Sequence, residues 1–221
     1  MKERFDAIFF DNDGILVDTE PLFLQATKEI LATVGVDLST EVYHDLTMRQ
    51  GRTVFEVVSA KGISDEQILE MRAVREVRYA DLIREGISVL DGVKETVAAL
   101  QGVRRTAIVT SSGRMHFELI HEQTGLLPYF EFVLADGDYT HHKPHPEPYE
   151  VAAKRMGVDP ARCLVIEDTE RGLTSATEAG MACVVIPNEL TESADFPGAL
   201  ARLDSMRELG PLLGIEVRHV S

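Results

Sequence analysis

The sequence has few cysteines and no long apolar run, and each of these absences excludes a class of protein. Only two cysteines occur among 221 residues, Cys163 and Cys183, and both lie in apolar runs typical of buried strands. We therefore expect two buried free thiols rather than a disulfide scaffold or a cysteine metal site. No stretch is apolar for long enough to cross a bilayer and no signal peptide is recognisable, so we expect a cytoplasmic protein.

Basic residues are also scarce. The chain has 22 Lys and Arg against 37 Asp and Glu, a formal net charge of −15 at pH 7. Because this charge repels polyanions, we expect neither nucleic acid nor an anionic membrane as a partner. The hydrophobic content of 44% is enough for one large core or for a core with a small appended domain. An anionic ligand would need local positive charge.

Two carboxylates follow the first apolar run. Residues 5–10 are typical of a buried strand, and Asp11-Asn12-Asp13-Gly14 comes directly after it. Alternate residues of an extended segment face the same way, so Asp11 and Asp13 can line one pocket. Neighbouring carboxylates repel unless they share a proton or a cation, and Mg²⁺ prefers such oxygen ligands. Taken alone, the motif is equally compatible with a surface turn.

Three more polar clusters each follow a strand-like run. Their members are Thr110, Ser111, Ser112, Lys143, Glu167 and Asp168. Pro144 and Pro146, which follow Lys143, stiffen its loop, and hydroxyls before a helix are suited to holding an oxyanion. Ligands of open α/β sheets bind at the carboxyl ends of the strands, so four clusters at successive strand ends indicate one site.

The pattern of apolar residues predicts an α/β fold with a helical insertion. We expect strands over 104–110, 131–135, 162–167 and 182–186, alternating with helices over 114–124, 146–156 and 171–179. This alternation indicates a parallel sheet with flanking helices. Three helices are expected in the insertion, over 22–34, 54–60 and 67–83, with Thr19 as a cap and Pro21 in the first turn. A last helix is expected over 206–213. The α/β domain would comprise residues 1–18 and 87–221, and the helical domain residues 19–86.

Together these motifs resemble the haloacid dehalogenase superfamily, in its phosphatase and phosphomutase branch. The matching residues are Asp11-x-Asp13-Gly14, Thr110, Lys143-Pro144, Glu167-Asp168, Gly172 and Ala179-Gly180. The resemblance extends from about residue 5 to about residue 187. It implies a Rossmann-like core with a small all-helical cap that closes over the active site. Asn12, His145 and Glu147 depart from the family pattern, which more often has an apolar residue, Ala and Asp at these positions.

The resemblance also implies a reaction. Asp11 would attack phosphorus and form an aspartyl phosphate, while Asp13 would protonate the leaving oxygen and later deprotonate the hydrolytic water. Lys143 would supply positive charge to the phosphoryl oxygens. Phosphate binding would fall to the hydroxyls and N–H groups of Thr110, Ser111 and Ser112. These roles describe a phosphoric monoester hydrolase.

Mg²⁺ is the implied cofactor. Its ligands would be the Asp11 carboxylate, the backbone carbonyl of Asp13 and the Asp168 carboxylate, and Glu167 would act through a water molecule or a neighbouring ligand. A histidine cluster also suggests a metal site, and it consists of His141, His142 and His145. We expect the carboxylates to hold the metal instead, because they suit Mg²⁺ better and a proline separates the histidines.

Substrate choice would depend on the helical domain, where Arg49 and Glu20 are candidate substrate contacts. The expected substrate is a small phosphorylated metabolite such as a sugar phosphate, bound by a monomer or a weak homodimer. A β-phosphoglucomutase-type phosphoryl transfer is the alternative. That subgroup has a cap histidine where this chain has Phe23, which favours hydrolysis. A dehalogenase fits less well, because dehalogenases of this superfamily lack a counterpart of Asp13.

Overall fold

Six parallel strands form the sheet that positions the candidate site. The computed structural model describes residues 4–49, 52–189 and 191–217. The strand order is β3-β2-β1-β4-β5-β6, and every neighbouring pair is parallel. The strands are β1 (Ala7–Phe10), β2 (Arg105–Gly113), β3 (Val133–Asp136), β4 (Cys163–Glu167), β5 (Ala182–Val185) and β6 (Ala201–Arg202). This Rossmann-like α/β arrangement confirms the predicted fold class.

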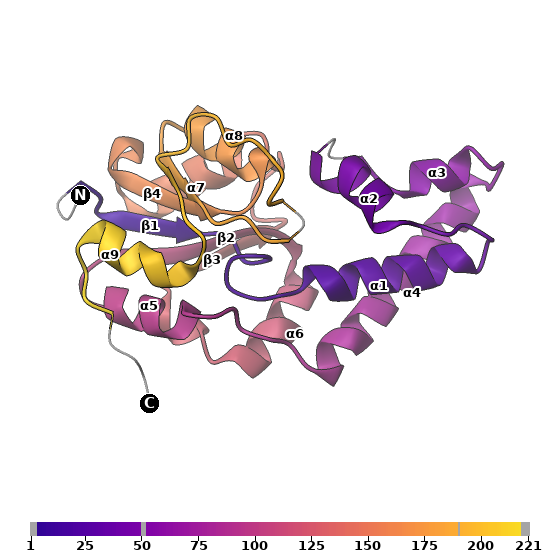
Figure 1. Ribbon diagram of the computed structural model, residues 1–221, viewed down its shortest axis with the longest axis horizontal. Coiled ribbons are helices and arrows are strands. Elements are labelled where there is room, and N and C mark those ends of the chain that lie inside the picture. Colours follow the sequence, from indigo (N-terminus) through magenta and orange to yellow (C-terminus); the bar gives the residue numbers. More distant parts are fainter. Residues whose placement is uncertain (1–3, 50–51, 190, 218–221) are drawn as a thin grey trace. The chain divides into compact units, whose positions relative to one another are not determined.

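Helices cover both faces of this sheet. They are α5 (Val93–Leu100), α6 (Arg114–Thr124), α7 (Glu147–Met156), α8 (Glu170–Glu178) and α9 (Leu209–Leu213), with short 3₁₀ helices η2 (Leu127–Tyr129), η3 (Pro160–Arg162) and η4 (Met206–Glu208). Helices α7 and α8 lie on one face, and α5, α6 and α9 lie on the other (Figure 1). Both faces of the parallel sheet are therefore buried, as its continuous apolar strands require.

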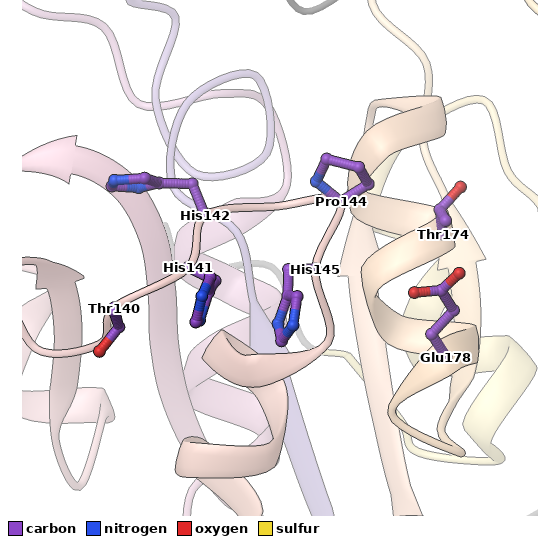
Figure 2. Close-up of a pocket in the computed structure, with 7 residues that line it drawn as sticks. All are labelled: Thr140, His141, His142, Pro144, His145, Thr174 and Glu178. Atoms are coloured by element: carbon purple, nitrogen blue, oxygen red, sulfur yellow. The ribbon is translucent and has the colours of Figure 1, made fainter.

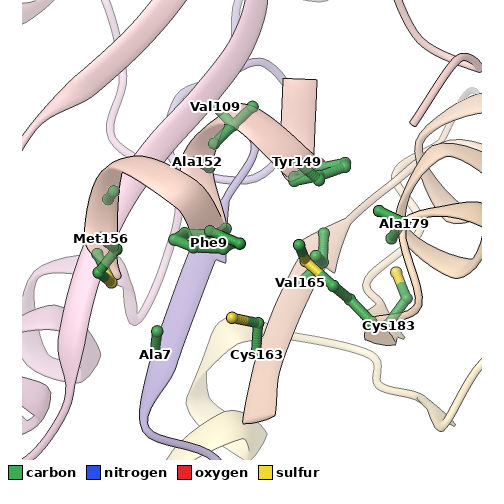
Figure 3. Packing of buried hydrophobic residues seen from close by; sticks show 14 of the residues in the cluster. Ala7, Phe9, Val109, Tyr149, Ala152, Met156, Cys163, Val165, Ala179 and Cys183 are labelled. Atoms are coloured by element: carbon green, nitrogen blue, oxygen red, sulfur yellow. The ribbon is translucent and has the colours of Figure 1, made fainter. Parts of the chain in front are cut away.

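Alternate strand residues build the core beneath α7 and α8. Ala7 and Phe9 of β1 are fully buried there with Val165 of β4, because side chains alternate between the two faces of a strand (Figure 3). Cys163 and Cys183 belong to the same cluster and are buried free thiols, as predicted. Burial raises the pKa of the Cys163 thiol to about 12, which keeps it protonated and unreactive at neutral pH.

The insertion is a helical unit with its own core. The chain forms two compact units, Met1–Asp18 with Ser88–Ser221 and Thr19–Ile87. The helices of the second unit are α1 (Glu20–Ala32), α2 (Thr40–Tyr43), η1 (His44–Arg49), α3 (Phe55–Ser59) and α4 (Asp65–Glu85), where η1 is a π-helix. Its buried residues include Leu31, Tyr43 and Phe55. No helix of the described residues is both long and apolar enough to cross a membrane.

Several boundaries differ from the sequence prediction. Strand β2 continues to Gly113, with a register shift against β3 after Val109, so Ser111 and Ser112, which we expected to follow the strand, are part of it. Helix α5 and strand β6 are additional. Pro21 lies in the first turn of α1 as expected, but the Thr19 side chain makes no capping hydrogen bond. The expected last helix divides into η4 and α9.

Candidate active site

The carboxyl ends of β1, β2 and β4 bring the predicted polar clusters to one edge. In register, Phe10 of β1 lies opposite Ile108 of β2 and Ile166 of β4. Asp11 and Glu167, which follow Phe10 and Ile166, are therefore level with each other. The backbone N–H of Asp11 continues the ladder by donating to the Ile166 carbonyl at 3.0 Å. Strand pairing thus holds the first carboxylate in place.

Lys143 is the positive centre of the group. Its Nζ donates to Asp11 Oδ1 at 2.9 Å, to Glu167 Oε1 at 2.7 Å and to the Val109 carbonyl at 2.9 Å. Its side chain is only 6% exposed, so the predicted catalytic lysine is buried rather than solvated at the surface. The three ammonium hydrogens all have protein acceptors, which fixes the position of the charge.

Burial and the charge of Lys143 have opposite effects on the pKa values of Asp11 and Glu167. Burial raises the pKa of the Asp11 carboxyl to about 7, although Lys143 lowers it. Burial alone would also raise the pKa of Glu167, but Lys143, Tyr149 and Thr169 outweigh this effect and lower it. Burial disfavours the Lys143 ammonium, yet Asp11 and Glu167 raise its pKa above the usual value. The ionised form of Glu167 is thus well stabilised by the lysine, whereas the ionised form of Asp11 is stabilised less.

Glu167 is fully buried, and both of its carboxylate oxygens accept hydrogen bonds. Its Oε1 also accepts from the Tyr149 hydroxyl at 2.8 Å, and its Oε2 accepts from the Thr169 hydroxyl at 3.1 Å. Helix α8 packs so closely that a Cβ on Gly172 would lie 1.8 Å from the Glu167 carboxyl carbon. The matched motif residue Gly172 therefore leaves room for the carboxylate that anchors Lys143.

Asp168 completes an acidic group. Its Oδ2 accepts a hydrogen bond from Asn188 Nδ2 at 2.8 Å. Gly14 has a positive φ of 78°, and a Cβ there would lie 2.2 Å from the same Oδ2. Glycine is thus required both by the turn after Asp13 and by the close approach of Asp168. Asn188 was missed in the sequence, although it too follows a strand at this edge, shortly after β5.

The acidic group fits a divalent cation. One carboxylate oxygen from each of Asp11, Glu167 and Asp168 lies within 4.8 Å of the others. The ammonium of Lys143 can offset one of these charges, and the raised pKa of Asp11 reflects the remaining repulsion and burial. An all-oxygen donor set with surplus negative charge is what Mg²⁺ prefers. The residues present therefore suit the expected cofactor.

The carboxylate of Asp13 turns toward the end of β2. Its Oδ2 accepts from the Ser112 hydroxyl and, at 3.3 Å, from the Thr110 hydroxyl. The Ser112 backbone N–H donates to Thr110 Oγ1 at 3.0 Å. In this structure the two hydroxyls expected to bind phosphate therefore hold the acid instead. Ser111 is exposed at the same strand end.

Sequence comparison identifies the family. The haloacid dehalogenase-like hydrolases match residues 8–186, which is most of the chain and includes every core motif described above. The chain belongs to this family. The resemblance seen in the motifs is thereby confirmed.

Relatives in this family are similar over nearly the whole chain. Protein CbbY of Rhodobacter capsulatus is 32% identical over 211 residues, covering 90% of this chain and 93% of that protein. The fructose-1-phosphate phosphatase YqaB of Escherichia coli (strain K12) is 32% identical over 189 residues, covering 83% and 97%. A mutant of CbbY from Rhodobacter sphaeroides, solved with xylulose-(1,5)bisphosphate, has a TM-score of 0.80 at 28% identity, covering 93% and 96%. The chain is thus a family hydrolase, and relatives named as phosphatases agree with the predicted phosphoric monoester hydrolase.

Asn12, one of the residues that depart from the family pattern, forms a buried hydrogen bond. Asn12, which stands between Asp11 and Asp13 in the sequence, is fully buried, and its Oδ1 lies 2.8 Å from Nε2 of His121. Nδ1 of His121 lies 2.9 Å from the Thr124 hydroxyl. Because Oδ1 only accepts, Nε2 carries the proton and Thr124 donates to Nδ1. Burial lowers the pKa of His121 to about 4. No local sequence pattern indicates this pair, because its members are 109 residues apart.

The candidate substrate contacts of the insertion lie in the helical unit. Glu20 Oε2 accepts from the Tyr43 hydroxyl at 3.1 Å within that unit. Phe23 stands edge-to-face against Tyr79 at 5.1 Å, and the Arg75 guanidinium lies 4.4 Å from its ring centre. The side chain of Arg49 lies outside the described residues. These positions keep their substrate roles as predictions only.

Proposed function

We propose that the protein is a Mg²⁺-dependent phosphatase that hydrolyses a small phosphorylated sugar through an aspartyl phosphate on Asp11. The observation that carries the proposal is the Lys143 ammonium, bonded to both Asp11 and Glu167 beside the Asp168 carboxylate. Cleavage of a phosphate monoester needs an in-line nucleophile and positive charge around the phosphoryl group. This edge of the sheet offers both.

In the first step, an Asp11 carboxylate oxygen bonds to phosphorus while the bond from phosphorus to the sugar oxygen breaks. Asp13 protonates that oxygen, and the sugar leaves as an alcohol. In the second step, Asp13 takes a proton from water, whose oxygen attacks phosphorus and releases Asp11 and inorganic phosphate. The bonds to Thr110 and Ser112 support this role, because they hold the Asp13 side chain at the edge of the site.

Lys143 acts mainly through its charge, since its three hydrogens are already bonded to protein. It holds one Asp11 oxygen, leaving the other for attack. A Mg²⁺ ion bound by the carboxylates of Asp11 and Asp168 and the Asp13 carbonyl, with Glu167 behind them, would neutralise charge on the phosphoryl oxygens when present. Ser111 would donate to those oxygens, as would Thr110 and Ser112 once their hydroxyls turn from Asp13 toward the bound phosphate.

The names of the relatives support a sugar phosphate as substrate. One relative is a fructose-1-phosphate phosphatase, and another is hexitol phosphatase B of Escherichia coli, 29% identical over 212 residues. CbbY was solved with a sugar bisphosphate. We further propose that the helical unit, residues 19–86, is the cap that selects the sugar, through Glu20 and Arg49, in a monomer or weak homodimer.

The test is release of inorganic phosphate from a panel of sugar phosphates, nucleotides and phosphocarboxylates, with Mg²⁺ and after its removal by a chelator. We expect the highest rate on a sugar phosphate, loss of activity without Mg²⁺, and no turnover by a folded Asp11→Asn variant. The panel includes β-glucose 1-phosphate with a sugar bisphosphate activator. Conversion to glucose 6-phosphate without free phosphate would replace hydrolysis by the mutase alternative.

A further inference from the structure

The loop that carries Lys143 has a second face, formed by histidines. Lys143 is buried against Asp11, whereas the His141 side chain, two residues earlier, is 61% exposed. Figure 2 shows His141 and His145 side by side, and their ring centres are 4.5 Å apart. The proline between them therefore does not separate these histidines. The expectation from sequence was wrong on this point.

Glu147, the first residue of α7, joins the two histidines. Its Oε2 accepts from Nδ1 of His141 at 2.6 Å, and its backbone N–H donates to Nδ1 of His145 at 3.1 Å. One possible ligand atom from each of the three residues lies within 4.8 Å of the other two. Two imidazoles and a carboxylate thus lie close together, apart from the acidic group of Asp11, Glu167 and Asp168.

The hydrogen bonds of these three residues suit metal binding. Nδ1 of His145 accepts a hydrogen bond from the Glu147 backbone N–H, so this nitrogen is unprotonated, and a metal would take its lone pair in place of that N–H. Backbone N–H groups of Thr140 and His141, with the His141 ring, lower the pKa of Glu147 to about 2, so its carboxylate is ionised. The proton shared by His141 and Glu147 is the one that a metal would displace.

The donor types differ from those of the acidic site. Imidazole nitrogen suits Zn²⁺, Cu²⁺ and Ni²⁺, whereas a set of carboxylates suits Mg²⁺. We propose that His141, His145 and Glu147 form a second metal site that binds Zn²⁺ separately from the Mg²⁺ site. The exposed rings, now stacked at 24°, would tilt so that both nitrogens point to one ion.

The surroundings leave room for the remaining ligands of the ion. A surface pocket of about 540 Å³ opens at these rings (Figure 2). Its lining comprises Thr140, His141, His142, Pro144, His145, Thr174 and Glu178. Zn²⁺ takes four ligands at about 2.0 to 2.2 Å, so water can occupy the fourth position.

The proposal is tested by equilibrium dialysis of the untagged full-length protein against Zn²⁺, with Mg²⁺ in large excess, and by the visible spectrum of Co²⁺ in the same site. We expect one Zn²⁺ per chain, nitrogen ligation in the Co²⁺ spectrum, and affinity weakened by more than about tenfold in His145→Ala. His142→Ala, in the same loop, is the matched control and keeps the affinity. Melting curves by circular dichroism establish that each variant is folded.

Two results would overturn the proposal. Unchanged Zn²⁺ affinity in folded His145→Ala and His141→Ala variants would show that these rings do not bind the ion. Loss of the Zn²⁺ in Asp168→Asn, or its full displacement by Mg²⁺, would place it in the acidic site. Neither result bears on the phosphatase activity, which is measured with Mg²⁺ alone.

Discussion

At the scale of single residues, Lys143 provides the positive charge that balances the carboxylates of the candidate site. A buried ammonium between two carboxylates is costly to form, but removing one partner is worse, because the remaining charges stay buried without compensation. Lys143 lowers the pKa of both acids, although burial still raises that of Asp11 to about 7. The charge to which we assign a catalytic role therefore also supports the fold.

Replacing Lys143 by Met tests this dependence. We expect the free energy of unfolding at pH 7 to fall by about 3 to 5 kcal/mol, because Asp11 and Glu167 lose their buried partner. Phosphate release should fall below detection. Urea unfolding measures the first effect, with Lys154→Met as the control, since Lys154 is exposed on α7. Equal stability of the two variants would contradict the assigned role.

Gly172 tests the packing behind Glu167. In Gly172→Ala the new methyl group would lie 2.0 Å from both Glu167 oxygens and force the carboxylate away from Lys143. We expect a loss of about 1 to 3 kcal/mol in stability, although Ala favours a helix by about 1 kcal/mol over Gly. Gly113→Ala is the matched control, because nothing lies within 4 Å of its Cβ position. A Gly172→Ala variant as stable as the parent would refute the packing argument.

His121 gives the protein a pH-dependent stability. Its pKa falls from 6.5 to about 4 on burial, so the folded state disfavours the proton that the unfolded state accepts below pH 6.5. The His121 contribution is therefore present above pH 6.5 and lost as the pH falls toward 4, by about 3 kcal/mol. Urea unfolding at pH 7 and pH 4 should show this loss relative to His121→Gln. Parallel pH profiles for the two proteins would contradict it, and His142→Gln serves as the exposed control.

At the scale of elements, the parallel strands and the helix ends do most of the positioning. The carboxyl ends of β1 and β4 present Asp11 and Glu167 at the same level, because the strands are in register. The helical unit also depends on hydrogen bonds at a helix end. Ser64 and Gln67 form a capping box at the start of α4, in which each side chain bonds to the other residue's backbone N–H.

Ser64→Ala removes the cap of α4. We expect a loss of about 1 kcal/mol in the stability of the helical unit, since a helix N-terminus loses a bonded N–H. The kcat for phosphate release should not change, because Ser64 belongs to no catalytic group. Thermal unfolding followed by circular dichroism measures the loss against Ser59→Ala, an exposed serine at the end of α3. No difference between the two variants would show that the cap is dispensable.

The elements that the sequence predicts well are those with a strong apolar period. The run before Asp11 and the run before Glu167 became β1 and β4, because buried parallel strands are apolar on both faces. Strand β6 has only two residues, Ala201 and Arg202, and such a short edge strand has no readable period. The extension of β2 to Gly113 depends on pairing with β3, which local sequence does not encode.

At the scale of the whole molecule, the site is assembled from segments that are far apart in the chain. Polar residues after strands could be placed at one edge because parallel topology brings those ends together. Contacts made by the side chains of loops could not be predicted. The Asn12–His121 pair and the meeting of His141 with His145 depend on how α6 and a loop pack in three dimensions.

The net charge of −15 also belongs to this scale. A phosphorylated substrate approaches a negative protein, so the Lys143 loop and a bound cation must provide the attraction locally. In the proposed mechanism, the Asp11 oxygen that is not held by Lys143 forms the bond to phosphorus.

The most direct test is to trap the phosphorylated enzyme. Asp13→Asn removes both the acid of the first step and the base that activates water in the second, so the variant is mixed with Mg²⁺ and 4-nitrophenyl phosphate, whose leaving group needs no proton, and the intermediate should accumulate. After an acid quench, peptide mass spectrometry should find one phosphoryl group, on Asp11. Absence of a covalent phosphate under conditions where the wild-type protein turns over, or its presence on another residue, would contradict the account.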